Sequence, residues 1–239
     1  MGNIETAKLI LDYVHRTMMH HAMWYAEVKH QYGFEKAMKM MQEVCDITYD
    51  IHLKRLSKIL DFGTTDGVPA FLADMPEEQL MSLKEGVAVS WLATDGVWFQ
   101  TVERAYGMFD AKRCNDSCWG QFSPLEAWSV KRFLALPEKP GLEGLKRAME
   151  YRLYAAVNKQ EVAEETENSF VFRMVDCRVQ SARRRKGLED YPCKSAGIIE
   201  YRSFAETIDP RITTECIACP PDTLERNWFC GWRFTLNKD

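Results

Sequence analysis

The cysteines in the last third of the chain carry the clearest chemical signal. Residues 215–234 read ECIACPPDTLERNWFCGWRF, which places Cys216 and Cys219 in a C-x2-C spacing before a Pro-Pro turn. Two thiolates at that spacing can reach one tetrahedral metal ion. Cys230 returns on the next predicted strand, and Cys193 begins a predicted helix, whose N-terminus favours the thiolate. We expect the four sulfurs to converge on zinc, with an iron–sulfur cluster as the minority alternative.

Two other interpretations compete with a metal site. The chain has eight cysteines, and its first residues, MGNIETAKLILDYVHR, lack the basic start and compact apolar run of a signal peptide. We therefore expect a cytosolic protein with reduced cysteines. Reduced thiols can form a redox dithiol, or they can fill a core as small apolar residues.

The segment TDGVWFQTVE at 94–103 is the most site-like stretch of the helical half. Asp95-Gly96 can break or start a helix, Trp98 follows, and Glu103 lies on an adjoining face. A tryptophan-lined pocket with two carboxylates could bind a polar substrate and activate water. The alternative is that Asp95 only caps a helix and Glu103 is only a surface charge.

Histidines and a basic run give weaker signals. All five histidines precede residue 53, so a metal site in the last third must use cysteine or carboxylate. His20 and His21 are alternative general bases, but adjacent helical residues point about 100° apart and a partly buried histidine is the plainer explanation. The run RRRKG, which begins at Arg183, could bind a phosphate or carboxylate, or could simply end a solvated helix.

Hydrophobic periodicity predicts helices first and strands later. Apolar residues recur at helical spacing over 6–29 and 34–60, Ser123-Pro124 resembles a helix start, and another helix follows Gly141. Alternation then predicts three strands within 169–175, 212–219 and 229–236, with a helix after Pro192. The fold class is α+β: a helical region over 1–160 and a cysteine-rich α/β region over 161–239 with a small antiparallel sheet and packed helices. The two regions could form one integrated domain.

A repeat is visible in the helical half. WYAEVKHQYGFEKA, from Trp24, matches WFQTVERAYGMFDA, from Trp98, and each copy predicts a helix, a Tyr-Gly break and a second helix. Such a pair of hairpins could enclose a cleft lined by Trp24, Trp91 and Trp98, or could only build core.

Bulk properties exclude some partners. The chain has 239 residues, 46% of them hydrophobic and 28% charged, and a net charge of −4. That charge gives no global attraction to nucleic acid, and no apolar stretch approaches the length of a membrane span. The expected partner is a small molecule, with no nucleic acid and no membrane, and a homo-oligomer is compatible with the sequence.

The motifs DGVWFQTVE, CRVQSARRRKGLEDYPCKSAG, EYRSFAETIDPRI and ECIACPPD…FCGWRFTL resemble a family of cytosolic prokaryotic proteins. That family is grouped with L-2-amino-thiazoline-4-carboxylate hydrolase, which opens a sulfur-containing ring to give N-carbamoyl-cysteine. The resemblance covers most of the chain and is strongest over 177–236. The ending also resembles, more weakly, the vinyl-reductase-type ligand-binding domain, in which cysteines near the last strands hold zinc.

Two functions from different classes follow. The resemblance implies a hydrolase of a cyclic amide-like C–N bond. The residue types themselves, and not the resemblance, suggest Asp95 or Glu103 to orient water, His20 or His21 as an alternative base, and Arg183 to bind the substrate. The alternative is a non-catalytic sensor that binds a small molecule or metal through its cysteine-rich site. Cysteine substitutions would abolish the function of the sensor, whereas carboxylate substitutions would abolish that of the hydrolase.

Overall fold

The computed structural model describes residues 2–222 and 226–238. The fold is α+β, as predicted. The chain divides into two compact units, Met1–Pro76 and Glu77–Asp239, and each is described here by itself. The domain boundary expected near residue 160 therefore lies inside the second unit, at the start of a strand.

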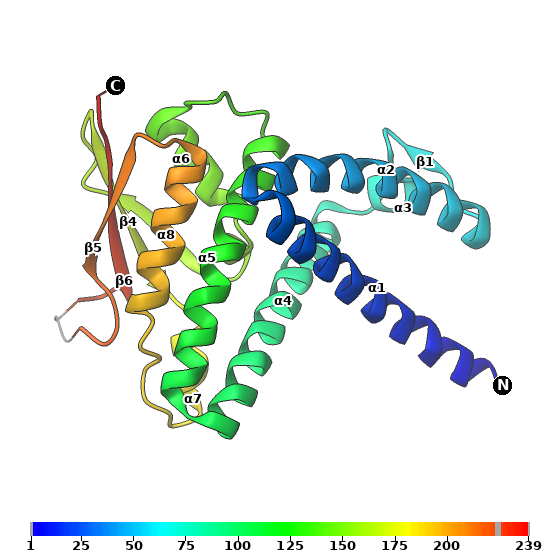
Figure 1. The fold of residues 1–239 in the computed structure, drawn as a ribbon, viewed down its shortest axis with the longest axis horizontal. Helices are drawn as coiled ribbons and strands as arrows, with labels where there is room; N and C mark the ends of the chain where they lie inside the picture. The colour runs from blue at the N-terminus through cyan, green and yellow to red at the C-terminus, as the bar shows by residue number, and fades with distance from the viewer. Residues whose placement is uncertain (1, 223–225, 239) are drawn as a thin grey trace. The chain divides into compact units, whose positions relative to one another are not determined.

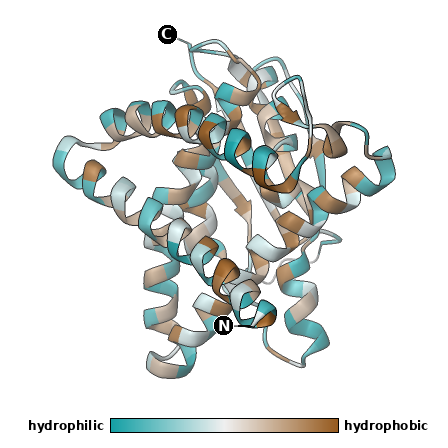
Figure 2. Cartoon of the chain, turned by 90° about the vertical axis from the view of Figure 1, so that its right-hand side faces the viewer, coloured by the Kyte–Doolittle hydropathy of each residue, from teal (hydrophilic) through white to brown (hydrophobic). Residues whose placement is uncertain are grey.

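The first unit is a helical hairpin with a small β-ribbon. The predicted helices over 6–29 and 34–60 are present. The elements are α1 (Asn3–Tyr32), α2 (Phe34–Leu60), β1 (Thr64–Thr65), β2 (Val68–Pro69) and α3 (Ala70–Ala73). Polar and apolar residues alternate along the long helices (Figure 2). Within the described part of the chain, no helix is both long and apolar enough to span a bilayer.

The predicted repeat is confirmed as two hairpins of similar length. In the second unit, α4 (Glu77–Tyr106) is followed by α5 (Met108–Phe133). Gly33 and Gly107 separate the helices of each hairpin, with φ of 83° and 86° and ψ of 167° and 171°. Only glycine adopts this conformation without strain. The sequence motif therefore encodes the same sharp break twice.

Two predicted helix boundaries are wrong. Helix α4 continues through Asp95-Gly96, and α5 continues through Ser123-Pro124. Ser123 is buried, and its hydroxyl donates to the backbone carbonyl of Glu200 at 2.6 Å. Packing of α5 against a distant helix thus outweighs the local preference of proline for a helix start.

The rest of the second unit forms a four-stranded antiparallel sheet covered by helices. The sheet order is β3-β4-β6-β5. The elements are α6 (Gly141–Glu150), the 3-10 helix η1 (Leu153–Ala156), β3 (Lys159–Ala163), β4 (Ser169–Asp176), α7 (Arg178–Arg185), α8 (Lys194–Ile208), β5 (Ile212–Ala218) and β6 (Cys230–Leu236). Strand β3 was not predicted, because it occupies an acidic run that resembles a linker. Figure 1 shows α8 on one face of the sheet, α5 against α8, and α4 beyond α5.

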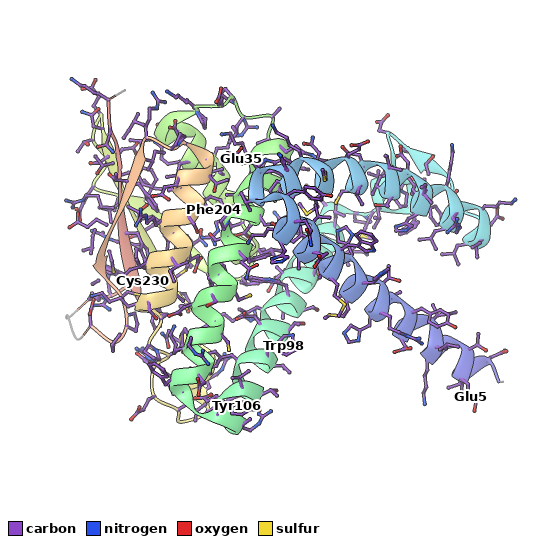
Figure 3. All side chains as sticks on the ribbon, in the orientation of Figure 1. Glu5, Glu35, Trp98, Tyr106, Phe204 and Cys230 are labelled. Carbon is purple, nitrogen blue, oxygen red and sulfur yellow. The ribbon has the colours of Figure 1, made fainter. Side chains whose placement is uncertain are left out.

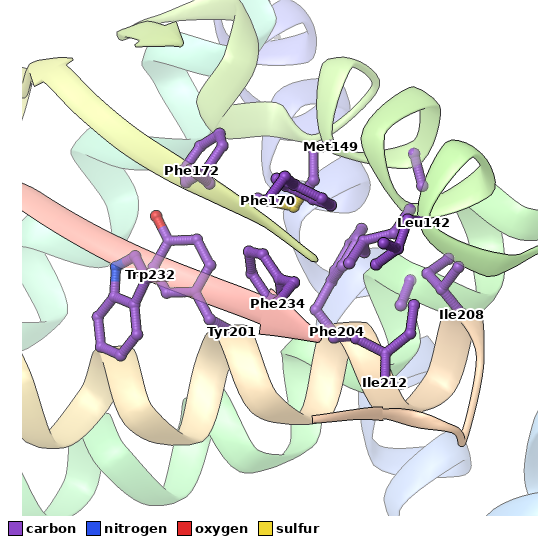
Figure 4. Packing of buried hydrophobic residues seen from close by; sticks show 14 of the residues in the cluster. Leu142, Met149, Phe170, Phe172, Tyr201, Phe204, Ile208, Ile212, Trp232 and Phe234 are labelled. Atoms are coloured by element: carbon purple, nitrogen blue, oxygen red, sulfur yellow. The ribbon is translucent and has the colours of Figure 1, made fainter. Parts of the chain in front are cut away.

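Aromatic residues fill the layer between α8 and the sheet (Figure 4). Tyr201 stacks on Trp232 with ring centroids 4.7 Å apart, and Phe204 is fully buried in the same cluster as Phe234. A Cβ at Gly197 would lie 2.6 Å from the Trp232 ring, so only glycine allows α8 to approach β6 this closely.

A buried ion triad joins the helices of the second unit. The Arg152 guanidinium donates from Nε to Glu126 Oε2 of α5 at 2.9 Å and from Nη2 to Glu200 Oε1 of α8 at 2.6 Å. Glu126 Oε1 also accepts from the Leu153 amide at 2.9 Å. All three charged side chains are at least nine-tenths buried. Burial raises the pKa of Glu200 to about 7, although the Arg152 charge opposes that rise.

Substitution at the Tyr-Gly break tests whether the hairpin geometry is conformational in origin. We expect Gly107→Ala to lower the free energy of unfolding by about 1–3 kcal/mol, because alanine is strained at this φ and ψ. A Cβ there would meet no atom within 4 Å, so steric overlap is not the cause. Gly96→Ala, inside α4, is the control and should stabilise by about 0.5–1 kcal/mol. Urea unfolding that ranks the two variants in the opposite order would contradict this account.

Removing the guanidinium should be far more harmful than removing one carboxylate. Arg152→Met leaves two buried carboxylates without a cation, and we expect a loss of about 3–5 kcal/mol at pH 8. Glu200→Gln leaves a one-to-one pair and should cost much less. In the Arg152→Met variant, protonation of the two buried carboxylates removes their unpaired charge and so stabilises the fold at low pH. This stabilisation is lost as pH rises and the carboxylates ionise, so the Arg152→Met deficit should shrink at pH 5. Urea unfolding at both pH values checks this. Equal deficits at both, or equal losses in the two variants, would refute it.

Candidate active site at the start of helix α8

Two sulfur atoms meet where α8 begins. Cys193 occupies the N-cap position of α8, and its Sγ lies 3.4 Å from Sγ of Cys219, which directly follows β5. The Lys194 amide donates to the Pro220 carbonyl at 3.0 Å, and the Lys194 ammonium pairs with Asp222 at 3.0 Å. The Asp222 carboxylate also accepts from the Cys219 amide at 3.1 Å. These contacts join the first residue of α8 to residues 219–222, the loop that follows β5 and is called the cysteine loop below.

The two thiols differ in acidity. The hydrogen bond from Cys219 lowers the pKa of Cys193, and the Gln180 amide at 3.5 Å and the charge of Lys112 lower it further, against the opposing effect of burial. The pKa of Cys219 is raised by its hydrogen bonds to Cys193 and Cys230 and by burial. Cys193 is therefore the more acidic thiol of the pair. A thiolate is the nucleophilic form of cysteine.

A polar bridge holds the groups around Cys193. Gln180 is buried on α7, and its side-chain amide exchanges two 2.8 Å hydrogen bonds with the backbone of Tyr191. The Tyr191 hydroxyl accepts from Lys112 Nζ and donates to Asn115 Oδ1, each at 2.7 Å. The Lys112 ammonium also lies 4.4 Å from the centre of the Tyr191 ring. These contacts fix the loop before Cys193 against α5.

Burial disfavours the thiolate form of two further cysteines of the last third, Cys216 and Cys177. Burial raises the pKa of Cys216 to about 11 and that of Cys177 to about 12. Cys230 is buried on β6 and hydrogen-bonds Cys219, on the sheet side of α8 (Figure 3). Metals require thiolates, which the environments of Cys216 and Cys177 disfavour.

The structure therefore brings together only part of the predicted metal site. Across residues 2–222 and 226–238, no group of three or more His, Cys, Asp or Glu side chains is arranged to hold a metal ion. Cys193 and Cys219 form a close pair, and Cys219 also reaches Cys230. Zinc and an iron–sulfur cluster both remain predictions.

An open groove of about 940 Å³ lies between α5 and α8, and its lining includes the two chain neighbours of Cys193 but neither Cys193 nor Cys219. Its lining combines apolar side chains, basic side chains and small residues. The lining residues are Phe109, Lys112, Arg113, Asp116, Ser117, Gly120, Pro192, Lys194, Ser195, Ile198, Ile199 and Pro221.

The carboxylates predicted to activate water lie apart. Asp95 and Glu103 are eight residues apart on the continuous helix α4, which separates them by roughly 12 Å along its axis. Burial raises the pKa of Asp95. Trp91 packs in an aromatic cluster, with its ring centroid 5.0 Å from that of Tyr154, whereas Trp98 is 64% exposed. None of these residues lines the groove between α5 and α8, and their role as a substrate pocket stays a prediction.

The other predicted site residues lie on α1 and α7. His20, His21 and Trp24 lie on α1 in the first unit, where the rings of His20 and Trp24 meet edge-on at 6.4 Å. Arg183 lies in the last turn of α7 and donates to the Glu189 carbonyl at 2.7 Å. Its basic run thus ends a helix and supports the following loop.

Comparison with known proteins gives a family without an activity. Residues 73–236 match the profile of a family described as "Family of unknown function (DUF6125)". The match spans the cysteine pair, the groove and the ion triad, and it gives no link to the thiazoline carboxylate hydrolase. No curated protein and no solved structure matches the chain. The chain belongs to the DUF6125 family of unknown function.

Proposed function

We propose that this protein is a small-molecule hydrolase that uses Cys193 as its nucleophile. One observation carries the proposal: Cys193 Sγ lies at the N-terminus of α8, 3.4 Å from Cys219 Sγ, within reach of the Gln180 amide and the charge of Lys112. Helix N-termini and nearby cations stabilise thiolates and are typical of reactive cysteines.

The substrate class follows from the resemblance of the sequence to thiazoline carboxylate hydrolases. The Cys193 thiolate adds to the carbonyl or amidine carbon of the ring, so an S–C bond forms and one ring bond of that carbon breaks. In a cyclic amide the bond that breaks is C–N and the nitrogen takes up a proton; in the thiazoline it is the ring C–S bond and the ring sulfur takes up the proton. Water then attacks that carbon, and the thiolate leaves. In this proposal the reacting atom is Sγ of Cys193, instead of a water molecule activated by Asp95, Glu103, His20 or His21.

Turnover and covalent labelling together test this proposal. Purified protein is incubated with 2-amino-thiazoline-4-carboxylate and related cyclic amides, and both ring opening and protein mass are followed by mass spectrometry. We expect Cys193→Ser to lower turnover by roughly 10³-fold or more and to abolish the adduct. Cys219→Ala should retain an adduct at Cys193 but shift the activity profile to higher pH, because the thiolate loses its S–H donor.

Cys45→Ser, in α2 of the first unit, is the matched control and should behave as the unsubstituted protein does. Undiminished turnover by Cys193→Ser would contradict the proposal. The absence of both turnover and an adduct with every one of these substrates would contradict it as well.

The sulfur contact also favours a second candidate, a non-catalytic sensor. A hydroperoxide could oxidise Cys193 to a sulfenic acid, which the Cys219 thiol would then attack to form a disulfide and release water. Alternatively, zinc could bind Cys193, Cys219, Cys216 and Cys230 after loss of their protons. Intact mass after peroxide treatment and elemental analysis of anaerobic protein separate these outcomes. In a sensor Cys219→Ala would be as damaging as Cys193→Ser, which the hydrolase does not require.

A further inference from the structure

The two long helices of the first unit leave most of their apolar surface uncovered. All 30 residues of α1 are described, and none of them is buried. On α2 only Ala37 and Met38 are buried, both just after the Tyr-Gly break. Figure 1 shows α1 and α2 spreading apart from that break, so neither helix covers the length of the other. The hairpin by itself is therefore an incomplete helical assembly.

The exposed apolar residues follow the heptad spacing of helices that pack on other helices. Successive members are separated alternately by three and four residues, which keeps them on one stripe of each helix. The α1 stripe consists of Ile4, Ala7, Leu11, Val14 and Met18, and the α2 stripe consists of Met40, Val44, Ile47 and Ile51. Apart from the alanine, each of these residues exposes between 43% and 74% of its surface. A surface helix normally turns such a stripe toward a core, so both stripes lack a partner.

The second hairpin shows what completes a pair of helices of this kind. Helix α5 corresponds to α2 in the sequence repeat, and the equivalent residues Ala37 and Ala111 are both buried. Further along, α5 buries Ala127 and Val130 in the same cluster as residues of α8, which packs against it. Across residues 2–76, by contrast, only β1, β2 and the four-residue α3 follow α2. The missing helices of the first unit can come from the same hairpin of a second copy.

The charges beside the two stripes are opposite in sign. Lys8 flanks the α1 stripe, and Glu43 and Asp50 flank the α2 stripe. Within residues 2–222 and 226–238, none of these three side chains takes part in a salt bridge. In heptad notation Lys8 occupies position e and both carboxylates occupy position g, and these two positions face each other when helices pair in parallel. The α1 stripe therefore complements the α2 stripe better than it complements itself.

The area of the two stripes is that of a stable interface. With about half of each side chain exposed, the eight large residues together present on the order of 800 Å² per copy, which is what each partner contributes to a standard-size interface. Each copy carries both stripes. A two-fold axis can therefore place α1 of each copy on α2 of the other and satisfy both stripes at once.

We propose that the first unit is a dimerisation module, in which α1 of each copy packs in parallel along α2 of a second copy. The two hairpins then form a four-helix bundle, and its core consists of the α1 and α2 stripes. The module is independent of the chemistry proposed for Cys193.

Sedimentation velocity of the full chain over a dilution series tests the apolar component. We expect a dimer, and Leu11→Gln with Met18→Gln should raise its Kd at least roughly a hundredfold, because both side chains lie in the bundle core. Met19→Gln with Met23→Gln removes comparable exposed apolar surface from α1 outside the stripe and should leave the Kd unchanged. Circular dichroism confirms that both variants keep their helix content.

A charge exchange tests which helices pair. Glu43→Lys with Asp50→Lys should raise the Kd of the dimer roughly tenfold, because like charges then face each other across the interface. Addition of Lys8→Glu to that variant should recover part of the loss, since it restores opposite charges between α1 and α2. Lys84→Glu, at an exposed position of α4, adds the same charge elsewhere and should recover nothing.

Each contrary outcome overturns a defined part of the proposal. A monomer at every concentration, or a dimer with the same Kd in the stripe variant and in its control, would overturn the dimerisation module. A dimer that the stripe variant weakens but that Lys8→Glu does not restore would overturn the pairing of α1 with α2. Cys193→Ser should leave the Kd of the dimer unchanged, so failure of the hydrolase and failure of the dimer are distinguishable.

Discussion

The second unit depends on one buried guanidinium. Arg152 lies between Glu126 of α5 and Glu200 of α8, and water reaches none of the three side chains freely. Without the cation, the two carboxylates would repel each other in this interior. The guanidinium between them offsets that repulsion and so stabilises the close packing of α5 against α8. The triad therefore sets the distance between the two helices that form the groove.

The same constraint acts on the chemistry at the start of α8. With α8 fixed against α5 by Arg152 and against β6 by the Gly197–Trp232 contact, its first turn can lie only beside the cysteine loop. Cys193 is thereby held against Cys219, and the helix N-terminus faces the sulfur pair. Packing further along α8, at Gly197 and Glu200, thus holds Cys193 beside the groups that lower its pKa.

Local patterns in the sequence predicted the elements well and their partners poorly. The second helix was predicted over 34–60 and is α2, Phe34–Leu60, because its periodicity is uninterrupted and a glycine precedes it. The prediction of a helix start at Ser123-Pro124 was wrong because it used a local signal. In the fold, the hydroxyl of Ser123 instead donates to the backbone carbonyl of Glu200 on another helix. The C-x2-C spacing indicated a sulfur site, but the close partner of Cys219 is Cys193, 26 residues earlier in the chain. No local signal marks Gln180 or Tyr191, because each gains its role only from the other.

The central claim is that the fold lowers the pKa of Cys193 by the groups that it places around the sulfur. The most direct measurement is a pH titration of the ultraviolet absorbance of the thiolate, taken as the difference between the protein and its Cys193→Ser variant. The account predicts a midpoint clearly below that of a free thiol, about 8.5, and a higher midpoint when Cys219 is replaced by alanine. A difference titration with a midpoint at or above the free-thiol value, or one unchanged by Cys219→Ala, would contradict it.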